Sequence, residues 1–155
     1  MNIAEKDGIL LESGTGEVEV LQFKVKGELY AINVVKVKEI LHIDNIAKVP
    51  NADIAVPGVS LIRGEVITVI DMLQVLESEK NRKIEKSMTL VCEFNQMKVA
   101  FAIDQVVGIT RIGWSDIQKP SNITSSSLVI GNINIEGKIV MLLDFEKTVV
   151  DTNSR

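Results

Sequence analysis

The sequence contains the same arrangement of short β segments twice, and this repeat limits how the chain can fold. Each half opens with two alternating apolar segments joined by a short turn. These segments lie at residues 21–25 and 29–33 in the first half and at 90–94 and 99–104 in the second. Alternation of apolar and polar residues is typical of a strand with one buried face. The halves are therefore predicted to be two β-rich structures of the same kind.

A second shared segment ends each half. Ile62–Asp71 and Ile135–Asp144 have in common an early glycine, an apolar run and a final aspartate. Each half passes through a proline, Pro50 or Pro120, before it reaches this segment. The repeat predicts a mainly β protein with two small barrels and a few short helices. Because a half of fewer than ~80 residues has a thin core, the barrels are expected to form one compact unit.

The charge balance argues against a protein that binds nucleic acid. The chain has 155 residues, with 17 basic and 21 acidic side chains and a formal net charge of −4. Nucleic-acid binding draws most of its affinity from basic side chains that contact phosphates. An aromatic content of 4% also argues against a surface on which bases stack. A small-barrel module that binds a ligand or nucleic acid is kept as the alternative function, because such barrels often host either.

Nothing in the sequence predicts secretion or insertion into a membrane. The N-terminus lacks the basic start and apolar stretch of a signal peptide. No apolar run approaches the ~20 residues that span a bilayer. The single cysteine, Cys92, lies in an alternating apolar segment and is predicted to be a buried thiol without a reactive role. We expect a soluble, cytoplasmic protein.

The domain boundaries are predicted from the polar stretches that interrupt the β segments. Residues 1–16 are expected to form a flexible arm with one helical turn near residues 8–13, followed by the folded domain at 17–155. The predicted parts of that domain are a first barrel at about 17–77, a linker at 78–87 and a second barrel at about 88–150. Val34–Ile43 fits both helical and strand spacing, and we expect a helical turn that passes into a strand.

Asp71 and Asp144 occupy matching positions, and a pair of carboxylates can act as general acid and base. Each, however, stands where a strand meets a short predicted helix, and an N-cap accounts for both. Gln74 is in the position of a capping-box partner for Asp71. His42 has no second ligand at metal-binding spacing. We therefore predict no catalytic residue, no metal site and no cofactor.

Glu39 and Arg63 are charged residues within apolar segments. Glu39 lies among Val37, Ile40 and Leu41, and Arg63 follows an apolar strand at a tight turn. Because burying one charge alone is costly, such residues usually pair with each other. Two interpretations remain open: an ion pair that joins two strands, and a pair at the edge of a binding groove.

Several motifs resemble the CheW-like adaptor domain of bacterial chemotaxis. They are Tyr30-Ala-Ile32, Val37-Lys-Glu-Ile40, Gly58, Arg63-Gly-Glu-Val-Ile67 and Val69-Ile-Asp71. The resemblance extends from about Val18 to Val150. Residues 8–15 and 110–120 are most similar to the N-terminal adaptor domain of CheV proteins, with CheW the next most similar.

The resemblance implies two five-stranded, SH3-like barrels and a scaffold without enzymatic activity. Such a scaffold couples chemoreceptor signalling tips to the regulatory domain of the histidine kinase CheA, in the cytoplasm at the membrane-associated receptor array. No nucleic acid and no direct membrane insertion are implied. A full CheV also has a C-terminal receiver domain with a phosphorylatable aspartate, which these residues lack. The chain is therefore expected to be an excised adaptor domain or a stand-alone relative.

The resemblance also implies which residues contact the two partners. In this family a receptor hairpin lies in a groove between the barrels, and the matching residues are Val34, Val37, Glu39, Val99, Ala100 and Val106. Glu39 and Arg63 are expected to pair at the rim of that groove. Gly58, Arg63 and Gly64 are expected to shape the surface that faces the kinase.

Overall fold

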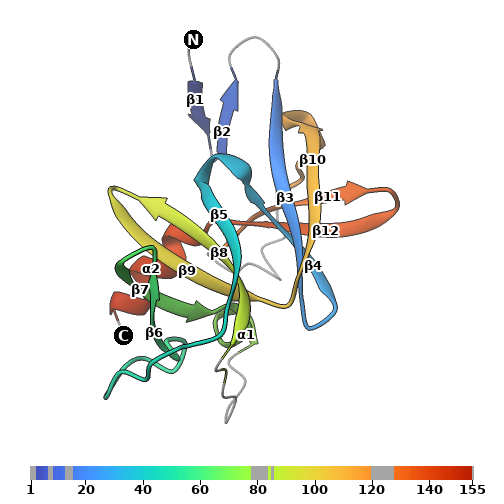
Figure 1. Ribbon diagram of the computed structural model, residues 1–155. Helices are drawn as coiled ribbons and strands as arrows, with labels where there is room; N and C mark the ends of the chain where they lie inside the picture. The colour runs from blue at the N-terminus through green and yellow to red at the C-terminus, as the bar shows by residue number, and fades with distance from the viewer. Residues whose placement is uncertain are drawn as a thin grey trace. The chain divides into compact units, whose positions relative to one another are not determined.

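The computed structural model describes residues 3–6, 9–12, 16–77, 84, 86–119 and 128–154 (Figure 1). The predicted mainly β class with short helices is confirmed. The first five-stranded sheet has the order β10 (Gln105–Gly113), β3 (Glu17–Val25), β4 (Glu28–Asn33), β12 (Lys138–Leu143) and β11 (Val129–Ile135). The second has the order β5 (Val37–Ile43), β8 (Ser87–Phe94), β9 (Met97–Ile103), β7 (Glu65–Asp71) and β6 (Gly58–Ile62).

Short helices connect or end the strands. They are η1 (Val34–Lys36), α1 (Met72–Glu77), η2 (Trp114–Asp116) and α2 (Phe145–Ser154). The helical turn η1 passes directly into β5, as the mixed spacing of Val34–Ile43 predicts. The prediction of a helical turn near residues 8–13 is wrong for residues 9–12, which the structure describes as a strand. There β2 (Ile9–Glu12) pairs with β1 (Ile3–Lys6), and this ladder satisfies backbone groups that a single helical turn would leave without partners.

The two compact units of the structure do not coincide with the two halves of the sequence. Unit 1 comprises residues 1–35 and 106–150, and unit 2 comprises residues 36–105 with the last five residues. The first sheet lies in unit 1 and the second in unit 2. Unit 2 is thus inserted into unit 1, and each barrel draws strands from both repeats. This division differs from the predicted barrels at about 17–77 and 88–150.

Parallel strand pairing explains the difference. β7 pairs in parallel with β9, and β12 pairs in parallel with β4. The last strand of each repeat therefore joins the first hairpin of the other repeat. The order of equivalent strands is the same in both sheets, so the repeat itself is real although its boundary is not a barrel boundary.

Four hairpins turn through two residues, each of which has a positive φ. The central pairs are Lys26-Gly27, Arg63-Gly64, Asn95-Gln96 and Glu136-Gly137. Two positive φ values define the type I′ turn, whose twist matches that of the strands it joins. Glycine provides the second position in three of the four turns because it adopts this conformation without steric cost.

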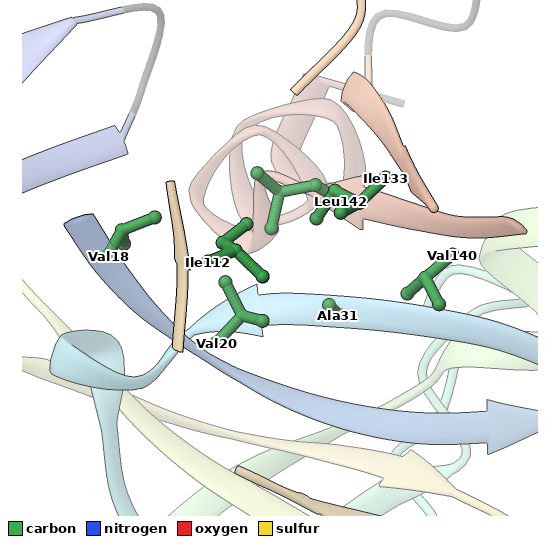
Figure 2. Close-up of a cluster of buried hydrophobic side chains, with 7 residues drawn as sticks. All are labelled: Val18, Val20, Ala31, Ile112, Ile133, Val140 and Leu142. Atoms are coloured by element: carbon green, nitrogen blue, oxygen red, sulfur yellow. The ribbon is translucent and has the colours of Figure 1, made fainter. Parts of the chain in front are cut away.

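Each barrel has its own apolar core. In unit 1 the core cluster takes residues from all five strands, and Figure 2 shows these side chains pointing toward one another: Val18, Val20, Ala31, Ile112, Ile133, Val140 and Leu142. The unit 2 cluster likewise uses all five strands: Ile43, Ile62, Ile67, Val69, Val91, Ala100 and Ala102. In both units the inward-facing positions alternate along each strand, as the sequence pattern predicts.

Both sheets curl until their two edges meet. In unit 2 the chain after β5 reaches β6. There the Ala47 N–H donates to the Val59 carbonyl at 2.8 Å, and the Val59 N–H donates to the Ala47 carbonyl at 2.8 Å. In unit 1 Gln118 and Asn132 form the same reciprocal pair at 2.9 and 2.7 Å. These two short bridges close the barrels.

A glycine stands beside each closing bridge. A Cβ atom at Gly58 would lie 2.0 Å from the Ala47 carbonyl oxygen. One at Gly131 would lie 2.7 Å from the Gln118 carbonyl oxygen and 2.6 Å from the Ile117 side chain. All three distances are shorter than nonbonded atoms tolerate, so closure requires a residue without a side chain at each position.

The inserted topology predicts which fragment of the chain folds alone. A fragment of residues 36–105 contains all five strands of unit 2 and should unfold cooperatively in urea. A fragment of residues 1–77, of similar length, contains one complete sequence repeat but only part of each five-stranded sheet. We expect it to remain unfolded, as measured by circular dichroism. Cooperative folding of 1–77 without 36–105 would contradict the observed strand order.

The closing bridge predicts a specific effect of Gly58→Ala. The added methyl group should force the Ala47 and Val59 backbones apart and reduce the free energy of unfolding by about 1 to 3 kcal/mol. Gly113→Ala is the matched control, since its Cβ would meet side-chain atoms alone: the Asp116 carboxylate at 3.1 Å and the Ser115 hydroxyl at 3.7 Å. Urea denaturation compares the two variants. Equal free energies of unfolding in the two variants would argue against a backbone bridge that needs glycine at position 58.

Candidate protein-binding surfaces

The two symmetric aspartates cap helices. The Asp71 carboxylate accepts a hydrogen bond from the Leu73 N–H at 3.1 Å, and Asp144 accepts one from the Glu146 N–H at 3.1 Å. An acid at this position satisfies an N–H group that the helix leaves unpaired and favours the positive end of the helix dipole. Capping therefore accounts for both carboxylates without a catalytic role.

The predicted capping box at Asp71 is wrong. The Asp71 N–H donates to the Ala55 carbonyl at 2.8 Å, so it is not available to Gln74. Gln74 is buried, and its Oε1 accepts no hydrogen bond. Sequence spacing identified the cap itself, but it could not reveal that a distant loop supplies the second partner.

The remaining candidate chemical groups have ordinary environments. Cys92 is fully buried in β8, and desolvation raises the pKa of its thiol to about 12, so the thiolate is strongly disfavoured near neutral pH. His42 is exposed on β5. Within the described ranges, no three His, Cys, Asp or Glu side chains come together in a way that could hold a metal ion. No described helix is both long enough and apolar enough to cross a bilayer.

Glu39 and Arg63 lie side by side in unit 2. The Arg63 Nε–H donates to Glu39 Oε1 at 2.7 Å, and a second guanidinium nitrogen also contacts that oxygen. Glu39 projects from β5, and Arg63 is the first residue of the turn between β6 and β7. Because β5 and β6 are opposite edges of the sheet, the pair spans the line along which the barrel closes.

The pair favours the ionised form of Glu39. The hydrogen bond from Arg63 lowers the pKa of the Glu39 carboxyl below its usual value, and the same contact raises the pKa of Arg63. The contribution of a carboxyl with a lowered folded-state pKa is present above its unfolded pKa. It is lost as the pH falls through the folded value. The Arg63 side chain is 77% exposed, so solvent screening keeps this contribution small.

A hollow of about 320 Å³ lies along the closing line of unit 2. One wall is formed by β5 from Glu39 onward and the two residues after it, and the other by the end of β6 from Ser60 and by Arg63 of the following turn. The Ser60 hydroxyl donates to the Asn45 carbonyl at 2.9 Å and narrows the hollow near the closing bridge. The lining is mixed in polarity and open to solvent, which suits contact with another protein better than enclosure of a small molecule.

The residues that the family resemblance assigns to receptor binding differ in exposure. Val34 and Val106 belong to unit 1, whereas Val37 and Glu39 lie on β5 of unit 2, and all four are partly exposed. Val99 and Ala100, by contrast, are buried on β9, with exposed fractions of 3% and 0%. Ala100 is part of the unit 2 core cluster.

Burial thus distinguishes residues that can contact a partner from residues that form the core, a difference that the sequence pattern did not show. Val99 lies between β7 and β8, with Thr68 and Cys92 as its register partners. A residue in the centre of a sheet can match a family motif because the fold needs an apolar side chain there, without any role in binding. Val99 and Ala100 present no side chain to a partner in this structure.

Gly58 also has a position that the sequence did not reveal. It is buried beside the closing bridge, and it has no side chain with which to contact a kinase. Its effect on the surface is indirect, because closure at Gly58 fixes where β6 and the turn after it lie. Arg63 and Gly64 are exposed at that turn.

The structure adds two exposed apolar residues beside Arg63-Gly64. Leu61 and Val66 are register partners on β6 and β7, and they are 72% and 71% exposed. Single exposed apolar residues are common, but an adjacent cross-strand pair forms a patch. The sequence shows which residues of β6 and β7 share a face with Leu61 and Val66. It does not show which face is exposed to solvent, because that depends on how the sheet curls.

The chain is similar to chemotaxis proteins over most of its length. The model of the CheW-like domain matches residues 19–152. Chemotaxis protein CheV3 of Helicobacter pylori is 29% identical over 153 residues, which cover 87% of this chain and 48% of CheV3. Chemotaxis protein CheW of Thermotoga maritima is 25% identical over 138 residues, covering 86% of this chain and 88% of that protein. This chain thus spans about half the length of the CheV relative and most of the CheW relative.

A solved structure supports the fold independently. The scaffolding protein TtCheW of Thermoanaerobacter tengcongensis superposes with a TM-score of 0.73 at 23% sequence identity. The match covers 81% of this chain and 88% of TtCheW. Agreement of this extent at low identity shows that the two chains have the same fold.

Proposed function

Since this chain belongs to the CheW-like domain family, we propose that it is a non-enzymatic adaptor that couples chemoreceptor signalling tips to the histidine kinase CheA. The caps formed by Asp71 and Asp144 and the buried thiol of Cys92 support a role without catalysis. Such an adaptor works in the cytoplasm at the receptor array. Its contribution is to hold two partners near each other.

The observation that carries this proposal is the exposed tip of the hairpin between β6 and β7. Leu61 and Val66 form an apolar patch beside the Arg63-Gly64 turn. An apolar centre with a charged residue at its edge is the usual composition of a protein interface. We assign this patch, with Arg63 and Gly64, to the contact with the regulatory domain of CheA.

The receptor contact is assigned to partly exposed residues named by the family motif: Val34, Val37, Glu39 and Val106. Receptor signalling tips are helical, and an amphipathic helix can bury its apolar stripe against valines while Glu39 contacts its polar edge. Within unit 2, Val99 and Ala100 are buried on β9 and pair with Cys92 and Val91, the register partners of Val37 and Glu39.

Each contact is expected to be weak by itself. A small interface must offset the entropy of ordering both partners, so micromolar affinity is expected for either one. An adaptor that holds receptor and kinase together converts the second binding event into an intramolecular one. The array then gains stability from many weak contacts without any single strong one.

The kinase contact predicts a result for Leu61→Glu and Val66→Glu. Each variant places a charge in the apolar patch and should weaken binding of the CheA regulatory domain about tenfold or more, measured by isothermal titration calorimetry. Ile139→Glu is the matched control. Ile139 occupies the equivalent position to Val66 in unit 1 and is also 72% exposed. Equal loss of binding in all three variants would count against a specific contact at the unit 2 hairpin.

The receptor contact predicts a result for Val37→Arg. The arginine should weaken binding of a receptor signalling hairpin about tenfold, because it places a charge where an apolar helix face is expected. Ile54→Arg serves as the control, since Ile54 is an exposed apolar residue of unit 2 outside the assigned contact. Circular dichroism should show that both variants remain folded. Unchanged receptor affinity in Val37→Arg would show that the contact lies elsewhere.

A further inference from the structure

One end of the unit 2 barrel carries charged residues at inward-facing positions. The core cluster, or side chains packed against it, includes one residue near this end of each of four strands: Leu41 on β5, Val91 on β8, Ala100 on β9 and Ile67 on β7. Because side chains alternate between the faces of a strand, the inward positions two residues from these, toward the end of the barrel, belong to its mouth. Those positions hold Glu39, Glu93, Lys98 and Glu65.

Ion pairs join the charges at this mouth two by two. The Lys98 ammonium lies 2.9 Å from Glu65 Oε1, and the Lys38 ammonium lies 3.5 Å from Glu93 Oε2. Glu93 and Lys98 are register partners on β8 and β9, which places their side chains next to each other. With the Glu39–Arg63 pair, three ion pairs make up what we call the charged ring: Lys38, Glu93, Lys98, Glu65, Arg63 and Glu39.

A β-bulge lets two consecutive residues join the charged ring. The register between β5 and β8 shifts between Val37 and Glu39, so Lys38 is the extra residue of a bulge. Neighbouring residues of a regular strand face opposite ways, but a bulge redirects one of them. Lys38 and Glu39 accordingly line the same small cavity of about 40 Å³, together with Arg63 and Lys98. The floor of this cavity is apolar: Ile62, Ile67 and Val91.

Unit 1 has the same strand order but no such ring among its described residues. By strand register, the positions of Glu93 and Lys98 are occupied in unit 1 by Lys24 and Leu29. The position of Glu65 is occupied there by Lys138. The equivalent of Arg63, at the first position of the corresponding hairpin turn, is Glu136. The barrel fold therefore does not require alternating charges at its mouth. This difference between two otherwise repeated units points to a role in recognition.

We propose that the charged ring positions the Glu39–Arg63 pair for docking of the receptor hairpin, with Lys98 as the positioning residue. This inference rests on the proposed function, which assigns Glu39 to the receptor contact. Lys98 lies on β9 between β8 and β7; its ammonium group pairs with Glu65, and the charges of Glu93 and Glu39 also act on it. The ring has three positive and three negative side chains; without Lys98 three carboxylates remain for two cations. Their mutual repulsion would displace Glu39 from Arg63.

The electrostatics of the residues agree with this geometry. The hydrogen bond to Glu65 raises the pKa of Lys98, and the charges of Glu93 and Glu39 raise it further. In return, Lys98 adds to the effect of Arg63 in lowering the pKa of Glu39. Glu39 therefore responds to a residue on a strand that is not its neighbour in the sheet.

The test uses the full chain with Lys98→Met and Lys98→Arg. The pKa of Glu39 is measured without any partner by NMR of its side-chain carboxyl carbon, and receptor affinity is measured with a signalling hairpin. Lys98→Met should raise the pKa of Glu39 toward its usual value and weaken hairpin binding about threefold, within the range of exposed ion pairs. Lys98→Arg keeps the charge and should restore both quantities. Lys138→Met, at the mouth of unit 1, should change neither.

The two readouts separate failure of the charged ring from failure of the proposed function. An unchanged pKa of Glu39 in Lys98→Met would overturn the ring. An altered pKa with unchanged hairpin affinity would overturn its role in docking. Absence of hairpin binding by the unmodified chain would overturn the receptor contact of the proposed function, and the docking role of Lys98 with it.

Discussion

Closure of each sheet upon itself is the constraint on which the rest of the structure depends. β5 and β6 are opposite edges of the unit 2 sheet, and they meet only because the Ala47 and Val59 backbones bond to each other beside Gly58. Closure removes free strand edges that would otherwise pair with other chains. It also brings Glu39 to Arg63 across the closing line. A buried glycine thereby determines the position of an exposed ion pair.

The sequence predicts local structure well and the assignment of strands to barrels poorly. Alternation, two-residue turns and the caps at Asp71 and Asp144 are set by neighbouring residues, so they are visible in the printed chain. The parallel pairs β7–β9 and β4–β12 join segments from different repeats, and no local pattern encodes them. The same limit applies to the candidate site. Glu39 and Arg63 stand out as charges among apolar residues, whereas the burial of Val99 follows only from the completed sheet.

The two units show how one fold can carry different surfaces. Their strand orders and closing bridges are equivalent, yet the hairpin with Arg63-Gly64 in unit 2 corresponds to one with Glu136-Gly137 in unit 1. Leu61 is replaced by Asn134, while Val66 and Ile139 are both apolar and exposed. The charged ring is present in unit 2 only, among the residues that the structure describes. Residues shared by the repeats maintain the barrels, and residues that differ are the candidates for recognition.

The central claim is that this chain joins receptor to kinase. The most direct measurement is sedimentation of CheA with membranes that contain chemoreceptors, with and without the chain. The account predicts that CheA sediments with the membranes only when the chain is added, and that the chain sediments with it. Sedimentation of the chain without additional CheA, or of CheA to the same extent in its absence, would contradict the account.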